Sequence, residues 1–161
     1  MKMKTFISII CSFILLFVPA QVMSQTTEKY ELEMAEIGKP GVLVVKVWCY
    51  SKKANIAEDL FRKCAIKGVL FEGVNDSGRM KGRKPLVLEG YDNHKDYFNL
   101  FFENREYNKY TRMALNGYVE QNSIIKIKKL YKVGKIVVIS FNELRTRLET
   151  DEIIKSLNSG F

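Results

Sequence analysis

Apolar residues recur along this chain with two different periods. Within residues 42–50 the alternate positions Leu43, Val45, Val47 and Cys49 are apolar, which predicts a strand with one wholly apolar face. Runs rich in β-branched and aromatic residues predict four further strands, at 69–74, 107–115, 124–130 and 133–141. Asn116 with Gly117 predicts a turn after the third of these runs.

Helical periodicity appears in three places. A stripe over 56–65 follows Asn55 and Glu58, which resemble a capping box, and Gly68 is expected to end that helix in a left-handed conformation. A second helix is predicted over 94–103. A third is predicted from the capping box at 140–143 through Leu148, with a break near Asp151 and a tail that packs back on the domain.

These amphipathic helices alternate with strands that have one apolar face, so each element must bury its apolar side against another layer. The expected fold class is therefore α+β, a two-layer sandwich in which a mixed or mainly antiparallel sheet carries its helices on one face.

The amino terminus has the pattern of an export signal. Lys2 and Lys4 precede an apolar run of 13 positions over 6–18, and small residues at Val22 and Ser24 satisfy a cleavage site before Gln25. That run is shorter than the roughly 20 residues that a membrane-spanning helix needs. We therefore predict a signal peptide over 1–24 and an exported protein, periplasmic or secreted, that is soluble after cleavage and has no transmembrane segment.

Removal of 24 residues from 161 leaves 137, a length that suits one domain. Residues 25–40 are polar at first and end in a Gly-Lys-Pro turn, so they are expected to form a flexible arm. Residues 41–161 are expected to form a single α+β domain.

Charge narrows the choice of partner. The whole chain carries 26 Lys and Arg against 18 Asp and Glu, and loss of Lys2 and Lys4 still leaves about +6. A basic surplus favours acidic partners. Outside the cytoplasm those partners are envelope proteins or anionic envelope polymers, and nucleic acid is not expected.

Cysteine use allows one disulfide after processing, between Cys49 and Cys64. Both fall on predicted apolar faces, and the alternative is two buried thiols that pack as small hydrophobic side chains. We favour the thiols because a domain of this length does not depend on a cross-link.

The strongest local candidate for function is the basic segment 78–84. Arg79, Lys81, Arg83 and Lys84 could together bind phosphate or carboxylate groups, since arginine grips such anions through two parallel hydrogen bonds. The alternative is an ordinary solvated loop. Trp48 and Tyr50 lie on the less apolar face of the strand at 42–50 and could form a ligand or partner face, or a second layer of core.

Candidate catalytic and metal-binding residues are sparse. His94 is the single histidine, and Asp92 and Asp96 each lie two positions from it. At that spacing they would face a different side of a helix start from His94, so no metal site and no cofactor are expected. The chain has no nucleophile elbow, no His-Glu-x-x-His and no phosphate-binding glycine loop. The sequence therefore favours a protein that is not an enzyme.

Three stretches of the chain resemble two groups of known proteins. The segment 131–148 resembles the final strand and helix of small bacterial surface lipoproteins, which are related in fold to activators of cell-wall synthases. Residues 45–53 and the tail 153–161 resemble uncharacterised exported proteins of anaerobic Gram-negative bacteria. The resemblance implies a small two-layer domain in the periplasm and no catalytic residues. The lipoproteins carry a lipid-acceptor cysteine after the apolar run, which this chain lacks.

The function expected from sequence is that of a non-catalytic accessory protein of the bacterial cell envelope, which binds a partner protein or an envelope polymer. The alternatives are a small periplasmic enzyme and a protein that binds an anionic ligand through the basic segment 78–84.

Overall fold

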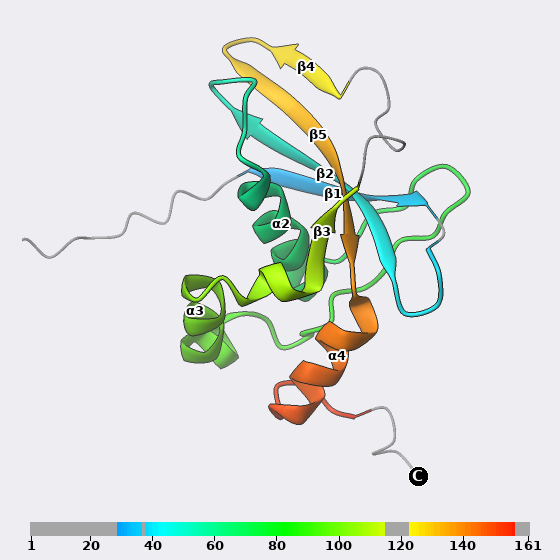
Figure 1. The fold of residues 1–161 in the computed structure, drawn as a ribbon, viewed down its shortest axis with the longest axis vertical. Coiled ribbons are helices and arrows are strands. Elements are labelled where there is room, and N and C mark those ends of the chain that lie inside the picture. Colours follow the sequence, from blue (N-terminus) through cyan, green and yellow to red (C-terminus); the bar gives the residue numbers. More distant parts are fainter. Residues whose placement is uncertain (1–28, 37, 115–122, 157–161) are drawn as a thin grey trace, which may run out of the picture.

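A computed structural model describes residues 29–36, 38–114 and 123–156 (Figure 1). The predicted signal peptide and the predicted turn at Asn116 and Gly117 lie outside these residues. The elements, in chain order, are β1 (Tyr30–Glu36), β2 (Leu43–Ser51), α2 (Glu58–Lys67), the π-helical turn η2 (Gly68–Glu72), the 3-10 turn η3 (Asp92–His94), α3 (Lys95–Glu103), the 3-10 segment η4 (Glu106–Tyr110), β3 (Thr111–Met113), β4 (Ile124–Ile127), β5 (Leu130–Ile139) and α4 (Phe141–Thr150).

The five strands form one antiparallel sheet in the order β1-β2-β5-β3. β4 pairs with residues 130–133 at the start of β5, whereas β3 pairs with residues 137–139 at its end. The register places Val45 opposite Val137 and Trp48 opposite Gly134. Side chains of a strand alternate between the two faces, so Val45 and Val137 share one face and Trp48 points to the other. We call the first the core face and the second the outer face.

Helices pack on the core face, where α2 contacts β2, β5 and β3 (Figure 1). The core joins Val45, Val47 and Val137 of the sheet to Phe61 of α2 and Leu144 of α4, all of which are fully buried. The predicted two-layer α+β sandwich is therefore confirmed. No helix in the described residues is long and apolar enough to cross a membrane.

The predicted flexible arm over 25–40 needs correction, because residues 30–36 form β1 along the edge of β2. Leu32 and Met34 are buried in the core. The sequence masks this strand because glutamates occupy the outer-face positions between the apolar ones, so the segment looks polar as a whole. Pairing with β2 satisfies its backbone and buries only the alternate side chains.

The predicted strand at 69–74 is also wrong. Residues 68–72 continue the helical path of α2 as η2, with Val69 and Leu70 buried. Gly68 is not a left-handed cap, since its φ is −62°. A Cβ at this position would lie 2.6 Å from Cδ2 of Leu32, so glycine is needed for the close approach of the helix to β1. Tertiary packing here overrides β propensity.

The predicted strand at 107–115 is shorter than expected. Residues 106–110 form η4, and only Thr111–Met113 pair with β5 as β3. Tyr107 is buried at 2% exposure, and its hydroxyl donates to both carboxylate oxygens of Asp59, at 3.1 and 3.0 Å. Because the Tyr107 ring is buried against α2, residues 106–110 do not pair with the sheet.

Helix positions agree with the sequence better than their capping does. α2 begins at Glu58 and α4 at Phe141, but neither Ala57 nor Ser140, which precede them, makes a side-chain cap hydrogen bond. α4 ends at Thr150, next to the predicted break at Asp151. Ile153 and Ile154 then pack against the core, as predicted for the tail.

Both cysteines of the described residues lie in the core. Cys49 is 2% exposed and Cys64 is fully buried, and no disulfide joins them. The prediction of two buried thiols is confirmed.

Candidate functional site

The basic segment is more ordered than a solvated loop. Val74 and Arg83 exchange backbone hydrogen bonds of 2.8 and 2.9 Å, and Ser77 and Met80 exchange a second pair of 3.0 and 2.9 Å. The carboxylate of Asp76 accepts the N–H of Gly82 at 2.6 Å. Residues 74–83 therefore form a narrow hairpin-like turn, which fixes where its basic side chains can reach.

The structure divides the four predicted anion-binding residues into two pairs. All four are exposed, but Arg79 and Lys81 lie near the tip of the turn, whereas Arg83 and Lys84 lie at its base and line a cleft. The guanidinium of Arg83 lies 4.8 Å from the ring centroid of Phe141, a cation–π contact that holds it against α4. The four cations thus do not form one site.

The cleft has a volume of about 1140 Å³ and lies between residues 83–89 and the segment formed by α4 and residues 152–156. Arg145 and Lys155 add positive charge to it, and Glu149 and Glu152 add negative charge. Arg145 is committed to Glu149, with Nε 2.7 Å from Oε1. The cleft is therefore mixed in charge. Its cations outside that ion pair are Arg83, Lys84 and Lys155.

His94 also lines the cleft. Its Nε2 lies 3.8 Å from a carboxylate oxygen of Glu89 and is buried without a hydrogen bond in the described part of the chain. Its ring meets the edge of Phe98, with centroids 6.4 Å apart. Within the described ranges, no group of three His, Cys, Asp or Glu residues is placed to hold a metal ion.

The second candidate, Trp48 with Tyr50, lies on the outer face of the sheet. Trp48 donates its indole N–H to Glu33 at 2.9 Å, and the amino groups of Lys46 and Lys132 lie 4.5 and 5.0 Å from its ring centroid. A Cβ on Gly134 would lie 2.7 Å from Cζ3 of this ring, so the indole packs directly on the backbone of β5. Glycine at this position lets the ring lie close to the strand.

Tyr50 belongs to the same surface. Its hydroxyl donates to Glu31 at 2.6 Å, and Glu31 accepts from Lys132 at 2.7 Å. The hydrogen bond from Lys132, followed by that from Tyr50, lowers the pKa of Glu31, and the hydrogen bond to Glu31 raises the pKa of Tyr50. Desolvation alone would lower the pKa of Lys132. The hydrogen bond to Glu31 outweighs this effect, so the pKa of Lys132 is raised. We call Trp48, Tyr50, Lys132, Glu31 and Glu33 the outer-face cluster.

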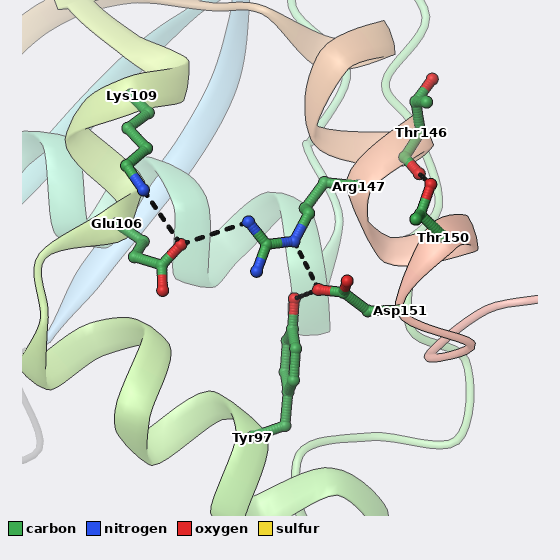
Figure 2. Close-up of polar contacts among 7 residues, drawn as sticks. All are labelled: Tyr97, Glu106, Lys109, Thr146, Arg147, Thr150 and Asp151. Carbon is green, nitrogen blue, oxygen red and sulfur yellow. Dashed lines mark hydrogen bonds and ion pairs between the residues drawn. The ribbon is translucent and has the colours of Figure 1, made fainter.

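A third cluster was not found from the sequence. Figure 2 shows polar contacts that link Tyr97 of α3 and Arg147 of α4 to Asp151. The Tyr97 hydroxyl donates to Asp151 at 2.6 Å, and Arg147 contacts Asp151 through Nε at 2.5 Å and Glu106 through Nη1 at 3.4 Å. Lys109 extends this series of contacts with an ion pair to Glu106. Its Nζ lies 3.3 Å from a carboxylate oxygen of Glu106. We call these five residues the helix-side cluster. The local signals for it are the i,i+4 spacing of Arg147 and Asp151 and the i,i+3 spacing of Glu106 and Lys109.

Hydrogen bonding sets the charge states of the helix-side cluster. The bond from Tyr97 lowers the pKa of Asp151, and Arg147 lowers it further. Burial, and then the bond to Asp151, raises the pKa of Tyr97. The bond to Asp151 raises the pKa of Arg147. These groups neutralise one another and tie the end of α4 to α3 and η4.

In comparisons with known proteins, no family model, curated protein or solved structure matches the chain.

Proposed function

We propose that this protein is a non-catalytic, exported accessory protein of the bacterial cell envelope, and that it binds a partner protein through the outer-face cluster. The observation that carries the proposal is the arrangement of Trp48 and Tyr50. Both rings are only partly buried, and each is fixed by a hydrogen bond to a glutamate. Tryptophan and tyrosine in fixed positions are the residues that contribute most to protein interfaces.

The charge of the outer-face cluster favours a protein over an anionic polymer. Lys132 is matched by Glu31, and Glu33 lies opposite Lys46 in the strand register. An anionic polymer would meet two carboxylates on this surface, whereas a protein can match charges of both signs. Held rings also lose little side-chain entropy on binding, which favours affinity.

Photo-crosslinking tests the proposal. A benzophenone amino acid at position 136, on the outer face beside Trp48, should give a discrete adduct with an envelope protein, and Trp48→Ala should remove the adduct. The matched control carries the same group at position 100, an exposed leucine of α3. Equal adducts from both positions, or an adduct that survives Trp48→Ala in a folded protein, would contradict the proposal.

Export is tested separately by intact mass of the protein recovered from the envelope fraction. We expect a chain that begins at Gln25 and carries no lipid. A retained Met1 or an added acyl mass would contradict this part of the proposal.

The cleft supports a second candidate function, the binding of an anionic ligand, because Arg83 and Lys84 both line it. The division of the basic segment provides a matched pair of variants, R83S/K84S and R79S/K81S, which remove the same charge from the cleft and from the tip. Co-sedimentation with acidic lipid vesicles, lipopolysaccharide and cell-wall sacculi should fall only for R83S/K84S, and should weaken with salt. Equal binding by both variants would exclude the cleft.

A further inference from the structure

The β4–β5 hairpin exposes an unusual amount of apolar surface. Every residue of β4 is exposed, and Ile124, Ile125 and Ile127 retain 57%, 45% and 43% of their accessible surface. Leu130, which begins β5, is exposed as well. Among the described residues, four of the six large apolar side chains that stand out as exposed lie on this hairpin. Strand alternation and the register place Ile125, Ile127 and Leu130 on one face of the hairpin and Ile124 on the other. Exposed apolar surface of this kind is typical of an interaction site.

The hairpin also has an open backbone edge. β4 pairs with β5 on one side, and in the described part of the chain no strand pairs with its other side (Figure 1). The carbonyl of Ser123 accepts the N–H of Gly134 at 2.7 Å, so Ser123 turns its backbone groups toward β5. In an antiparallel pair, the residues of a strand alternate between those whose backbone groups bond to the partner strand and those whose backbone groups point away from it. The N–H and C=O of Ile124 and Lys126 therefore point away from β5. An extended segment could bond to both.

Charge identifies what would fit this edge. Residues 123–135 contain five lysines and no aspartate or glutamate. Lys132 and Lys135 are engaged with Glu31 and Glu58, whereas Lys126, Lys128 and Lys129 are exposed along β4 and its turn. A second copy of the hairpin is a poor occupant, because edge-to-edge pairing would set lysine against lysine. A segment that carries carboxylates is complementary.

We propose that the open edge of β4 binds an extended, acidic segment of a partner protein by strand addition. The segment's backbone would bond to Ile124 and Lys126, its apolar side chains would cover Ile125 and Ile127, and its carboxylates would meet the three exposed lysines. This inference rests on the proposed function only in that the partner is a protein; it uses different residues from the outer-face cluster.

A peptide assay tests the proposal with a defined probe. The probe is an acetylated, fluorescein-labelled nine-residue peptide in which glutamate alternates with valine or threonine, and binding is followed by anisotropy. We expect saturable binding by anisotropy. In NMR spectra of the protein, we expect the peptide to shift only the backbone amide signals of the hairpin. A peptide with lysine in place of glutamate should not bind, and a peptide with proline at its centre should bind far more weakly, because strand pairing needs both charge and an unbroken backbone.

Protein variants then locate the site. K126S/K128S/K129S should weaken binding about tenfold, as expected for three exposed ion pairs. K39S/K95S/R105S removes the same charge from exposed positions outside the hairpin and the cleft and should leave binding unchanged. Lys126→Pro removes one outward N–H without touching the bonds between β4 and β5, and it should abolish binding while circular dichroism stays native.

Several outcomes would overturn strand addition. Equal weakening by the two triple variants, or full binding by the central-proline peptide, would indicate charge attraction alone. Binding to acidic lipid vesicles that K126S/K128S/K129S weakens, with no binding to the peptide, would assign the hairpin to a membrane surface. Hairpin-dependent self-association in sedimentation would assign it to a second copy. Absence of a specific crosslink at position 136 in a protein that retains Trp48, with intact peptide binding, would contradict the proposed function and leave this inference standing.

Discussion

Two clusters that share one kind of contact, a carboxylate bonded by both a tyrosine hydroxyl and a cation, occupy different regions of the molecule. In the helix-side cluster Tyr97 donates to Asp151 at 2.6 Å, and in the outer-face cluster Tyr50 donates to Glu31 at the same distance. In each, a cation also contacts the carboxylate, Arg147 in the first and Lys132 in the second. The chemistry is alike, but the two clusters connect different parts of the chain.

The helix-side cluster joins elements that no strand pairing holds together. Tyr97 and Asp151 are 54 positions apart, on α3 and just beyond α4. The outer-face cluster bridges β1, β2 and β5, which backbone hydrogen bonds already join. We therefore expect the first cluster to stabilise the fold and the second to shape a surface at little cost in stability. Similar contacts thus contribute differently to stability, depending on what else holds the elements that they join.

The largest change in stability is expected at Gly134, where the outer face is tightly packed. It is the exception to the expectation that changes on the outer face cost little stability. Gly134→Ala places a Cβ 2.7 Å from the ring of Trp48 and should lower the free energy of unfolding by about 2 kcal/mol. In a Trp48→Ala background the same change should be neutral or slightly stabilising, because alanine is less flexible than glycine when unfolded. Urea denaturation of the four proteins in a double-mutant cycle measures this; additive effects would contradict the packing.

The next effect concerns Tyr97→Phe, which removes the hydroxyl that links α3 to Asp151. We expect a loss of about 1 kcal/mol in unfolding free energy, because a hydrogen bond to a carboxylate is lost between otherwise separate elements. Thermal or urea denaturation measures it. A variant as stable as the wild type would show that the aromatic packing of α3 alone holds this region.

The matched change on the outer face is Tyr50→Phe, which removes a hydrogen bond of the same length. Here we expect a change within about 0.5 kcal/mol, because strand pairing maintains the geometry and the group lies at the surface. The same denaturation series compares it with Tyr97→Phe. A loss equal to that of Tyr97→Phe would remove the distinction between the two clusters.

The smallest effect is a dependence on pH. The pKa of Asp151 is lowered in the folded state, first by Tyr97 and then by Arg147, so its contribution is present above the pKa of an unfolded aspartate, about 4, and is lost as the pH falls. The stability difference between wild type and Tyr97→Phe should thus be constant near neutrality and narrow on acidification below about pH 4. Denaturation at several pH values checks this, and a gap that widens in acid would contradict it.

The candidate site was only partly predictable. Trp48 and Tyr50 were identified from the alternation of β2, and the structure places both on the outer face as that alternation requires. Their partners Glu31 and Glu33 were not, because they lie on β1, which looked like an arm. Arg79, Lys81, Arg83 and Lys84 are close in sequence, but the turn of 74–83 directs only the last two to the cleft.

Local patterns in the sequence determined the α+β class, the two faces of β2 and β5, and the starts of α2 and α4, because each depends on neighbours within a few positions. Tertiary structure alone decided that Tyr30–Glu36 would pair with β2, and that Gly68–Glu72 would coil against Leu32 although it is rich in strand-forming residues. It also decided that Tyr97 would meet Asp151. Each of these contacts joins residues far apart in the chain, and their energy depends on burial and pairing that exist only once the sheet and its helices have come together.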